Sequence, residues 1–401
     1  MWLTENYPPQ RGGMAHSCDR IVRTLREAGV TVDVAHFSAR HDDWRVETKR
    51  NGRHFQCPVR EDAAHALNRL WNVLENDHAA CSLTTHVVAF GGLLPLMAAP
   101  IYAAWLGVPL LTLVRGNDFD AGIFSLKRGD VLREALTRAA HVCAVSRDKV
   151  EKIKALYPHA QVSCVPNGID LTDWQLTPAD RQQAADWRQV HVEPGRRVLG
   201  LFGHLKRKKG GLFFLEALLR SGHARRFHLL LVGEIEAEMT EWLTAHQTEI
   251  AFTPLPFHDR YELLPYYAAC EMIVLPSFYD GLPNVLLEAA GLGIPALASR
   301  AGGMADHLIT DQHAILFRPG EAHDCRQAIT QAANMSDEQL RRMGDNCSSL
   351  AATAFDHRVE AHSYESILRH TLDRATPISR FDHDDVAPAC SPAALQEAEI
   401  A

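Results

Sequence analysis

The sequence predicts an α/β protein with two Rossmann-like domains, each a parallel sheet covered by helices, that face each other across a cleft. Short apolar segments of strand length alternate with amphipathic helices before residue 171 and again after residue 195. The residues between these two series, 171–195, are polar and indicate a linker. A chain of 401 residues also exceeds what one hydrophobic core usually supports, which favours two domains.

The first series begins at the amino terminus. Met14, Cys18, Ile21, Val22 and Leu25 recur at helical spacing and predict a helix that ends before Gly29. The strands have near-continuous apolar runs, which is typical of a parallel sheet buried on both faces. We expect these strands at residues 1–4, 32–37, 86–90, 110–114, 141–145 and 162–165.

The second series has the same alternation, with helices expected at 212–219 and 285–291. Its strands are expected at residues 198–202, 227–232, 250–254, 272–275 and 296–299. We therefore divide the chain into an N-terminal domain (1–175), a C-terminal domain (190–356), a last helix (357–375) and a disordered tail (376–401).

Composition excludes several classes of protein. The formal net charge is -8, which argues against a nucleic-acid-binding protein. Nine cysteines without a C-x-x-C pair, and no secretory signal, indicate free thiols and a cytoplasmic location. Residues 91–114 carry no charge, but Pro95, Pro100 and Pro109 interrupt them, and Pro109 divides a buried helix from a buried strand, which explains the run without a membrane span.

The strongest local signal follows the strand expected at 272–275 and runs from Ser277 to Pro295. Pro283 fits the first turn of a helix, and the free amides of that turn attract an anion such as a diphosphate. Asn284 and Glu288 lie four residues apart and share one helix face. A carboxylate at Glu288 would accept hydrogen bonds from a ribose diol. The alternative is an ordinary strand–turn–helix with a solvated Glu.

A second signal is the loop 203–211, which joins the strand at 198–202 to the next helix and includes four consecutive cations, residues 206–209. Cations between a strand end and glycines form a plausible clamp for phosphate. A solvated basic loop is the alternative. The position of this loop at a strand carboxyl end, in the same domain as Glu288, favours the clamp.

Two further loops follow strands of the first domain. Gly12 and Gly13 allow backbone amides to approach a ligand, although the sequence has no G-x-G-x-x-G of a dinucleotide site. Arg115 begins a loop that continues through Asn117, Asp118 and Asp120. A D-x-D pair of this kind holds a divalent metal in another transferase architecture, but a solvated acidic turn is at least as good an interpretation. If the loop is functional, we interpret it as acceptor-side.

Together these motifs resemble the retaining glycosyltransferase family 4, glycosyl transferases group 1, of GT-B fold. The resemblance covers most of residues 1–375. It depends on the joint order of several segments: Glu5 to Met14, Val165 to Asp170, Gly203 to Gly210, Leu231 to Gly233, Asp280 to Pro295, and Ala301 to Gly303.

The resemblance implies roles for individual residues. The family's E-x7-E motif reads Asp280-x7-Glu288 here, which implies that Asp280 contacts the donor sugar and Glu288 the donor ribose. Lys209 matches the family's diphosphate-binding Lys, and Gly13 matches the glycine whose loop approaches the diphosphate. The implied set has three catalytic residues, Asp280, Lys209 and Arg115. The donor-binding residues are Gly12, Gly13, His204, Arg207, Lys209, Leu282, Pro283, Asn284 and Glu288, and the acceptor-side residues are Asn117 and Asp118.

The chain departs from the family pattern at two positions. His204 stands where an Arg is usual, so Lys206 or Arg207 would substitute for it, and Arg115 stands where many members have a His. The last helix resembles the one that crosses back onto the N-terminal domain in this fold. The resemblance further implies transfer on the front face of the sugar with retention of configuration.

The expected partners follow from the same resemblance. They are a nucleotide-diphosphate sugar as co-substrate, with no cofactor and no metal, and a carbohydrate or lipid-linked acceptor in polysaccharide or glycolipid assembly. Peripheral contact with the inner face of the membrane is open, as are the nucleotide, the sugar and the oligomeric state. The sequence leaves two rival functions, a GT-B-type nucleotide-sugar epimerase and a two-domain ligand-binding protein without turnover. A metal-dependent D-x-D enzyme is a weaker alternative.

Overall fold

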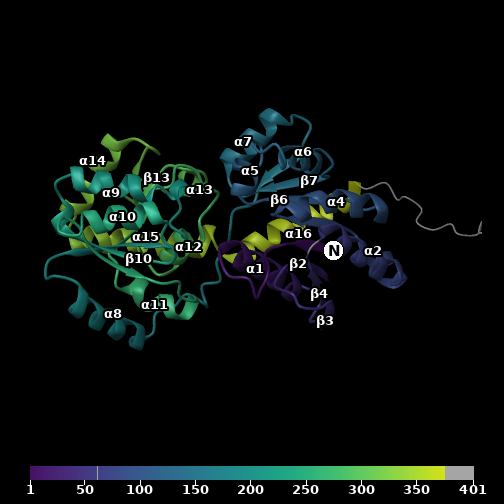
Figure 1. Ribbon diagram of the computed structural model, residues 1–401, viewed down its shortest axis with the longest axis horizontal. Helices are drawn as coiled ribbons and strands as arrows, with labels where there is room; N and C mark the ends of the chain where they lie inside the picture. Colours follow the sequence, from purple (N-terminus) through teal and green to yellow (C-terminus); the bar gives the residue numbers. More distant parts are fainter. Residues whose placement is uncertain (61, 375–401) are drawn as a thin grey trace, which may run out of the picture.

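The computed structural model describes residues 1–60 and 62–374 and places them in two α/β units that lie side by side (Figure 1). Each unit has one sheet, and all strand pairs are parallel except one at the edge of the first sheet. The predicted fold class is confirmed. The tail that we expected to be disordered, residues 376–401, lies outside the described residues.

The first sheet has eight strands in the order β3-β4-β2-β1-β5-β6-β7-β8. Adjacent residues of its central strand, Trp2 and Leu3, belong to different hydrophobic clusters, so both faces of the sheet are buried. The strands are β1 (Trp2–Thr4), β2 (Val34–Ser38), β3 (Arg45–Lys49), β4 (Gly52–Pro58), β5 (Val87–Phe90), β6 (Leu110–Val114), β7 (His141–Ala144) and β8 (Val162–Cys164).

Seven helices connect these strands. The longest, α1, begins at Gly13, directly after Gly12. The uncharged segment forms α4, which ends at a left-handed Gly107, and then β6, as the prolines predicted. The helices are α1 (Gly13–Glu27), α2 (Ala63–Glu75), α3 (His78–Leu83), α4 (Leu93–Leu106), α5 (Asn117–Asp120), α6 (Gly129–Thr137) and α7 (Arg147–Leu156). None of the helices within residues 1–60 and 62–374 is long and apolar enough to cross a membrane.

The second sheet has six parallel strands in the order β11-β10-β9-β12-β13-β14. The strands are β9 (Arg197–Phe202), β10 (Phe227–Val232), β11 (Ala251–Leu255), β12 (Met272–Leu275), β13 (Ala296–Ser299) and β14 (Ala314–Phe317). The helices of this part are α8 (Pro178–His191), η1 (Arg207–Lys209), α9 (Gly211–Arg220), η2 (Ala224–Arg226), α10 (Ala237–Ala245), α11 (Arg260–Ala268), α12 (Asn284–Gly291), α13 (Gly303–His307), α14 (Ala322–Asn334) and α15 (Asp337–Ala354).

The last helix, α16 (His357–Arg374), leaves the second unit and packs on the first. Figure 1 shows it in yellow among the purple and blue elements of the N-terminal unit. Tyr364 and Ala361 of this helix join the same hydrophobic cluster as Trp2 and Val22. The C-terminal end of the described chain therefore ties the two units together.

Strand order determines where the loops with the predicted site residues lie, because each loop follows the carboxyl end of a strand. In the first sheet, β2 lies on one side of β1 and β5 lies on the other, so the strand order reverses at β1. In the second sheet, β10 lies on one side of β9 and β12 lies on the other, so the order reverses at β9. Ligands of doubly wound sheets bind at such switch points, outside the strand carboxyl ends. The Gly12–Gly13 loop follows β1, the basic loop follows β9, and the Asp280 segment follows β12.

Four elements, α8, β3, β4 and β14, and the start of α12 differ from the sequence-based expectation. The segment expected as a linker contains α8, which begins with a Thr177–Asp180 capping box and packs on α11. The antiparallel hairpin β3–β4 and the edge strand β14 were not predicted. In β3 the only apolar side chain, Val46, is 45% exposed, so the strand lacks the apolar run that marks the buried strands. Pro283 is the N-cap residue of α12 and lies one position before the first turn.

Candidate active site

Two predicted catalytic side chains meet at the carboxyl edge of the second sheet. The Lys209 ammonium, at the end of η1, forms an ion pair with the Asp280 carboxylate, which follows β12. The backbone N–H of Gly281 donates to the other carboxylate oxygen at 3.0 Å. Asp280 is 13% exposed and Lys209 30%, so most of the carboxylate is enclosed while the ammonium is more accessible.

The surroundings of Asp280 favour its ionised form. Burial by itself would raise the pKa of this carboxyl, but the neighbouring Lys209 charge and hydrogen bond, with Lys208 and the Gly281 amide, hold the pKa below its ordinary value. Asp280 therefore presents a negative charge beside a positive one. Such a pair can contact a sugar hydroxyl with one partner and a phosphate with the other.

Glu288 lies about one helical turn into α12 and has the opposite electrostatic character. The Tyr267 hydroxyl on α11 donates to Glu288 Oε2 at 2.6 Å. Burial raises the pKa of the Glu288 carboxyl to about 7, although the Tyr267 hydrogen bond and the charges of Arg20 and Arg260 act to lower it. Phe202 stacks on the Tyr267 ring with centroids 4.1 Å apart, which fixes the phenol.

The N-terminal unit contributes the glycine loop on the opposite side. Gly12 has φ 110°, a conformation that favours glycine, and directly precedes α1. The Asn284 side-chain amide donates to the Gly13 carbonyl at 2.9 Å and to Ser17 Oγ at 3.2 Å. The first residue of α12 therefore binds the N-terminal unit directly.

Most of the remaining basic loop is more exposed. Lys208 Nζ donates to Asn117 Oδ1 of the N-terminal unit at 3.4 Å, so these two residues face each other across the cleft. His204 is exposed, with Nδ1 3.3 Å from Glu234 Oε2. Arg207 is also exposed. The structure thus brings Lys209, Lys208 and Asn117 toward Asp280 and leaves His204 and Arg207 at the rim.

Arg115 is a buried link between three segments. Its guanidinium donates to the Tyr364 hydroxyl at 2.6 Å and to Asn167 Oδ1, and it lies 3.4 Å from Glu360 Oε1. The Arg115 side chain is 2% exposed. The catalytic role expected for Arg115 stays a prediction, and these contacts favour a positioning role. Asn167 Nδ2 in turn donates to the carbonyl of Leu282 at 2.6 Å, which connects Arg115 to the loop before α12.

The two carboxylates of the D-x-D pair have separate partners. Asp118 accepts backbone N–H groups of Arg115, Gly116 and Phe119 within 3.1 Å. Asp120 Oδ1 lies 2.8 Å from the Nζ of Lys149, which is almost fully buried. Each carboxylate therefore serves the local fold, and the acceptor-side role expected for Asp118 stays a prediction.

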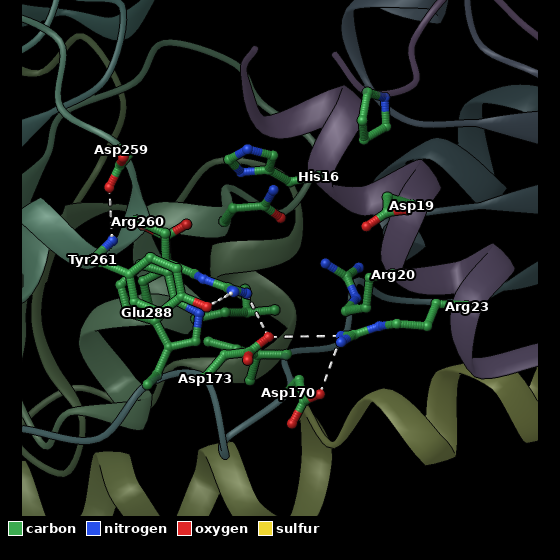
Figure 2. Close-up of a pocket in the computed structure, with 16 residues that line it drawn as sticks. His16, Asp19, Arg20, Arg23, Asp170, Asp173, Asp259, Arg260, Tyr261 and Glu288 are labelled. Atoms are coloured by element: carbon green, nitrogen blue, oxygen red, sulfur yellow. Dashed lines mark hydrogen bonds and ion pairs between the residues drawn. The ribbon is translucent and has the colours of Figure 1, made fainter. Parts of the chain in front are cut away.

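A cavity of about 380 Å³ lies between α1 and the C-terminal unit (Figure 2). Glu288 and Asn284 line it from α12, and Arg20 and Arg23 line it from α1. At its floor Arg23 Nη2 lies 3.1 Å from Asp170 and 3.6 Å from Asp173. The cavity therefore has cations and carboxylates on both sides, beside apolar side chains such as Trp174 and Leu287.

Sequence reasoning missed several of these cavity residues. Arg260, which forms an ion pair with Asp173, and Tyr261 both begin α11 shortly after the carboxyl end of β11. That position was the signal that could have marked them. Tyr267 and Arg20 lie within helices and carry no comparable sequence signal.

Two family models match the chain. Residues 11–173 match "Glycosyltransferase Family 4" and residues 196–335 match "Glycosyl transferases group 1". Together these two segments include most of the chain.

Relatives and solved structures agree with the family models. The chain is 24% identical over 282 residues to TuaC of Bacillus subtilis, assigned as a teichuronic acid biosynthesis glycosyltransferase, with 69% of each chain covered. It is 25% identical to the Escherichia coli UDP-Gal:alpha-D-GlcNAc-diphosphoundecaprenol alpha-1,3-galactosyltransferase, covering 54% of this chain and 56% of that one. The fold matches that of HepE from Anabaena in complex with UDP and glucose, with a TM-score of 0.71, 18% identity, and 92% and 98% of the two chains covered.

Proposed function

Because this chain belongs to the family 4, group 1 glycosyltransferases, we propose that it transfers a hexosyl group from a nucleotide-diphosphate sugar to a carbohydrate or lipid-linked acceptor. The proposal includes retention of anomeric configuration and no requirement for a metal ion. The observation that carries it is the convergence of Lys209, Asp280 and Glu288 around α12, opposite the Gly12 loop.

The donor would lie along the N-terminal end of α12. Glu288 accepts the ribose hydroxyls in the cavity, and the nucleobase extends toward Arg260 and Tyr261. The first-turn amides of α12 and the Lys209 ammonium face the diphosphate. Asp280 forms an ion pair with Lys209 and precedes α12, whereas Glu288 lies within that helix. With the ribose at Glu288 and the diphosphate at Lys209, Asp280 then contacts the sugar.

The chemistry needs stabilisation of a departing diphosphate. The bond from the sugar C1 to the phosphate oxygen breaks, the acceptor oxygen bonds to C1 on the same face, and the acceptor proton passes to the departing phosphate oxygen. Charge develops on that diphosphate and on an oxocarbenium-like sugar. Lys209 and the helix amides stabilise the former, and the Asp280 carboxylate stabilises the latter. These groups supply the required charges without a divalent cation.

The donor nucleotide to test first is a UDP sugar. The Escherichia coli relative uses UDP-Gal according to its name, and HepE was solved with UDP and glucose. The same relative acts on a diphosphoundecaprenol-linked acceptor by name, which supports a lipid-linked acceptor as one class.

An exposed apolar loop supports contact with a membrane surface. Phe124 is 85% exposed and Leu126 is 100% exposed, and the next two residues are Lys127 and Arg128. Aromatic and aliphatic side chains beside cations suit the interface of an anionic bilayer. Sedimentation with anionic vesicles checks this role, and a Phe124→Ser, Leu126→Ser double variant that sediments as well as the wild type would refute it.

The decisive experiment combines transfer with nucleotide binding. Purified protein is incubated with UDP-, GDP- and ADP-sugars and a panel of saccharide and polyprenyl-diphosphate-linked acceptors, in the presence of chelator. Lys209→Ala should abolish transfer and weaken nucleotide binding. Arg225→Ala, which removes an exposed cation of the same unit outside this loop, should leave both unchanged and serves as the matched control.

The products distinguish the proposal from its rivals. A new glycosidic bond with the donor's anomeric configuration supports a retaining transferase. A changed sugar nucleotide without acceptor indicates an epimerase, and binding without any product indicates a ligand-binding protein. Activity that is lost in chelator and restored by Mn²⁺ would contradict the metal independence.

A further inference from the structure

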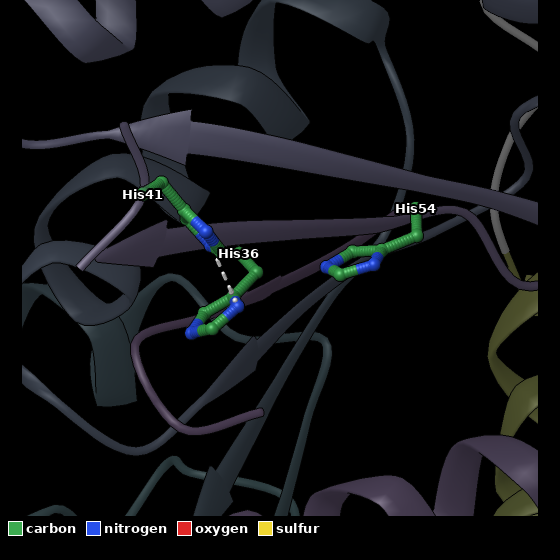
Figure 3. A group of neighbouring side chains, drawn as sticks. All are labelled: His36, His41 and His54. Atoms are coloured by element: carbon green, nitrogen blue, oxygen red, sulfur yellow. Dashed lines mark hydrogen bonds between the residues drawn. The ribbon is translucent and has the colours of Figure 1, made fainter. Parts of the chain in front are cut away.

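Three histidines of the N-terminal unit form a buried cluster that the proposed reaction does not use. His36 lies in β2, His41 in the loop after β2, and His54 in β4 (Figure 3). They are 0%, 7% and 5% exposed. One ring nitrogen from each lies within 4.8 Å of the other two, and among the described residues this is the only such group of His, Cys, Asp or Glu. From these positions we infer that the histidine cluster is a binding site for a transition metal ion, with Zn²⁺ as the first choice.

Spacing of the nitrogens suits such an ion. His41 Nε2 and His36 Nδ1 are 3.0 Å apart, and Figure 3 shows a ring nitrogen of His54 turned toward this pair. Two nitrogens bound to one tetrahedral Zn²⁺ at about 2.0–2.1 Å lie roughly 3.3–3.4 Å apart. Small side-chain movements would therefore bring all three imidazoles to bonding distance.

The hydrogen bonding of the cluster is incomplete without a further ligand. Nε2 of His54 is buried, and it has no hydrogen-bond partner among the described residues. Leaving a buried polar atom unpaired costs stability, so native structures usually satisfy it. A metal bound by two or three of these rings would use nitrogen lone pairs and reorient the remaining N–H groups.

The imidazoles also have the protonation state that a metal requires. Burial, together with the neighbouring His41 and His54 rings, lowers the pKa of His36 to about 3, and burial lowers the pKa of His54 to about 4. Burial lowers the pKa of His41 as well, so burial favours the neutral form of all three rings, and neutral imidazole is a common ligand of zinc.

Tyr7 and a surface hollow lie beside the histidine cluster. His54 and Tyr7 line a surface hollow of about 550 Å³, which offers an ion a path to the cluster from the His54 side. The Tyr7 ring lies edge-on to His36 and His54, with centroids 6.0 and 5.0 Å away. Tyr7 belongs to the β1–α1 loop that carries Gly12, so an occupied site would fix the base of the loop that faces the donor.

The test is metal binding by the untagged full-length protein after treatment with chelator. We expect one Zn²⁺ per chain by isothermal titration, and Co²⁺ should give visible absorption bands typical of four-coordinate nitrogen and oxygen ligation. His41→Gln and His54→Ala should each weaken Zn²⁺ binding at least about tenfold, the smallest loss usual for changes around a metal site. Zinc should also raise the melting temperature of the wild type.

A matched control separates ligation from packing. His86→Gln replaces another buried histidine of the same unit, whose Nε2 lies 3.0 Å from Thr371 Oγ1, and it should retain wild-type zinc affinity. His41 lies outside the strands, so His41→Gln should fold normally by circular dichroism. The inference is overturned if no saturable binding of Zn²⁺ occurs. It is equally overturned if folded His41→Gln binds Zn²⁺ as the wild type does, or if Co²⁺ gives only thiolate charge-transfer bands. Each of these readouts is independent of transferase activity.

Discussion

Replacing Glu288 by Gln should stabilise the free protein above neutral pH while it weakens nucleotide binding. The wild-type carboxyl is enclosed beside Tyr267, and burial raises its pKa from 4.5 to about 7. Gln has the same shape and carries no charge, and its carbonyl oxygen can still accept the Tyr267 hydroxyl. The substitution therefore removes the cost of a buried charge without creating a cavity.

The sign follows from proton binding in the folded and unfolded states. Between pH 4.5 and about 7 the folded Glu288 carboxyl keeps its proton, whereas the unfolded one has lost it. The free energy of unfolding therefore falls as pH rises through this window, and above it the folded protein bears the full penalty. At roughly 1.4 kcal/mol for each unit of pKa, the shift from 4.5 to about 7 corresponds to at most about 3 kcal/mol. Partial opening of the cavity to solvent reduces the expected gain to about 1–2 kcal/mol.

The measurement is thermal unfolding of both proteins at pH 5, 6, 7 and 8. At pH 8 the Glu288→Gln variant should melt a few degrees higher, since about 1 kcal/mol shifts a domain of this size by roughly 2–4 °C. The difference should shrink towards pH 5, because Glu288 is still protonated in the folded protein there and pH 5 lies near the lower end of the window. The difference in melting temperature between the two proteins reports on Glu288 alone, because every other titrating group is present in both.

Nucleotide binding provides the second half of the same test. The ribose hydroxyls lose an ionised acceptor in Glu288→Gln, so affinity for the nucleotide should fall about tenfold or more. Tyr267→Phe, which keeps the carboxylate and removes its hydrogen-bond donor, serves as a comparison. A Glu288→Gln protein that is no more stable than wild type at pH 8 would refute the electrostatic reasoning.

Three further substitutions test how the cleft is held. Gly302→Ala adds a Cβ 2.1 Å from the Asp280 carbonyl oxygen at a residue with φ 50°, so transfer should fall sharply. Gly222→Ala is the control, because Gly222 also has a positive φ (76°) but has free space around it. This control should lose only about 1–2 kcal/mol of stability by thermal unfolding and keep its activity. Arg115→Met should cost about 2–3 kcal/mol of stability, because Tyr364 and Asn167 lose their buried donor while Arg20 still pairs with Glu360, and urea unfolding checks this. Asn284→Ala should raise the donor KM more than it lowers kcat, because it removes the bond to the N-terminal unit, and steady-state kinetics would contradict this if KM were unchanged.

How much of the fold the sequence predicts depends on burial. Strands β10, β12 and β13 begin and end at the predicted residues, because buried parallel strands are apolar runs that stand out against helices. The β3–β4 hairpin gave no such signal, since β3 is mostly exposed and polar. The helix α8 was hidden in the same way, with Ala184 as its only fully buried residue.

Some residues of the candidate site could be predicted to meet from their position in the sequence, and others could not. Lys209 and Asp280 follow the ends of the adjacent strands β9 and β12, so strand order alone predicts that they converge, whereas Gly12 belongs to the other sheet. Arg115 also follows a strand end, yet its guanidinium is bound by Tyr364 and Glu360, which lie about 250 residues later on α16. Pairing over such a separation depends on tertiary packing, which local sequence patterns do not encode.

The opposite electrostatics of the two carboxylates lead to a last prediction, that donor binding releases a proton. Asp280 is ionised beside Lys209, whereas at pH 6.5 most of Glu288 is protonated in the free protein. Both ribose hydroxyls can donate to Glu288 only when it is ionised, so binding should expel up to one proton per chain. Titration calorimetry with a sugar nucleotide in buffers of different ionisation enthalpy measures this directly. A sugar nucleotide is preferable to the free nucleoside diphosphate, whose terminal phosphate titrates near this pH. The Glu288→Gln variant supplies the control without a proton to lose, and a wild-type binding enthalpy independent of buffer at pH 6.5 would show that the ribose does not bind Glu288 in its ionised form.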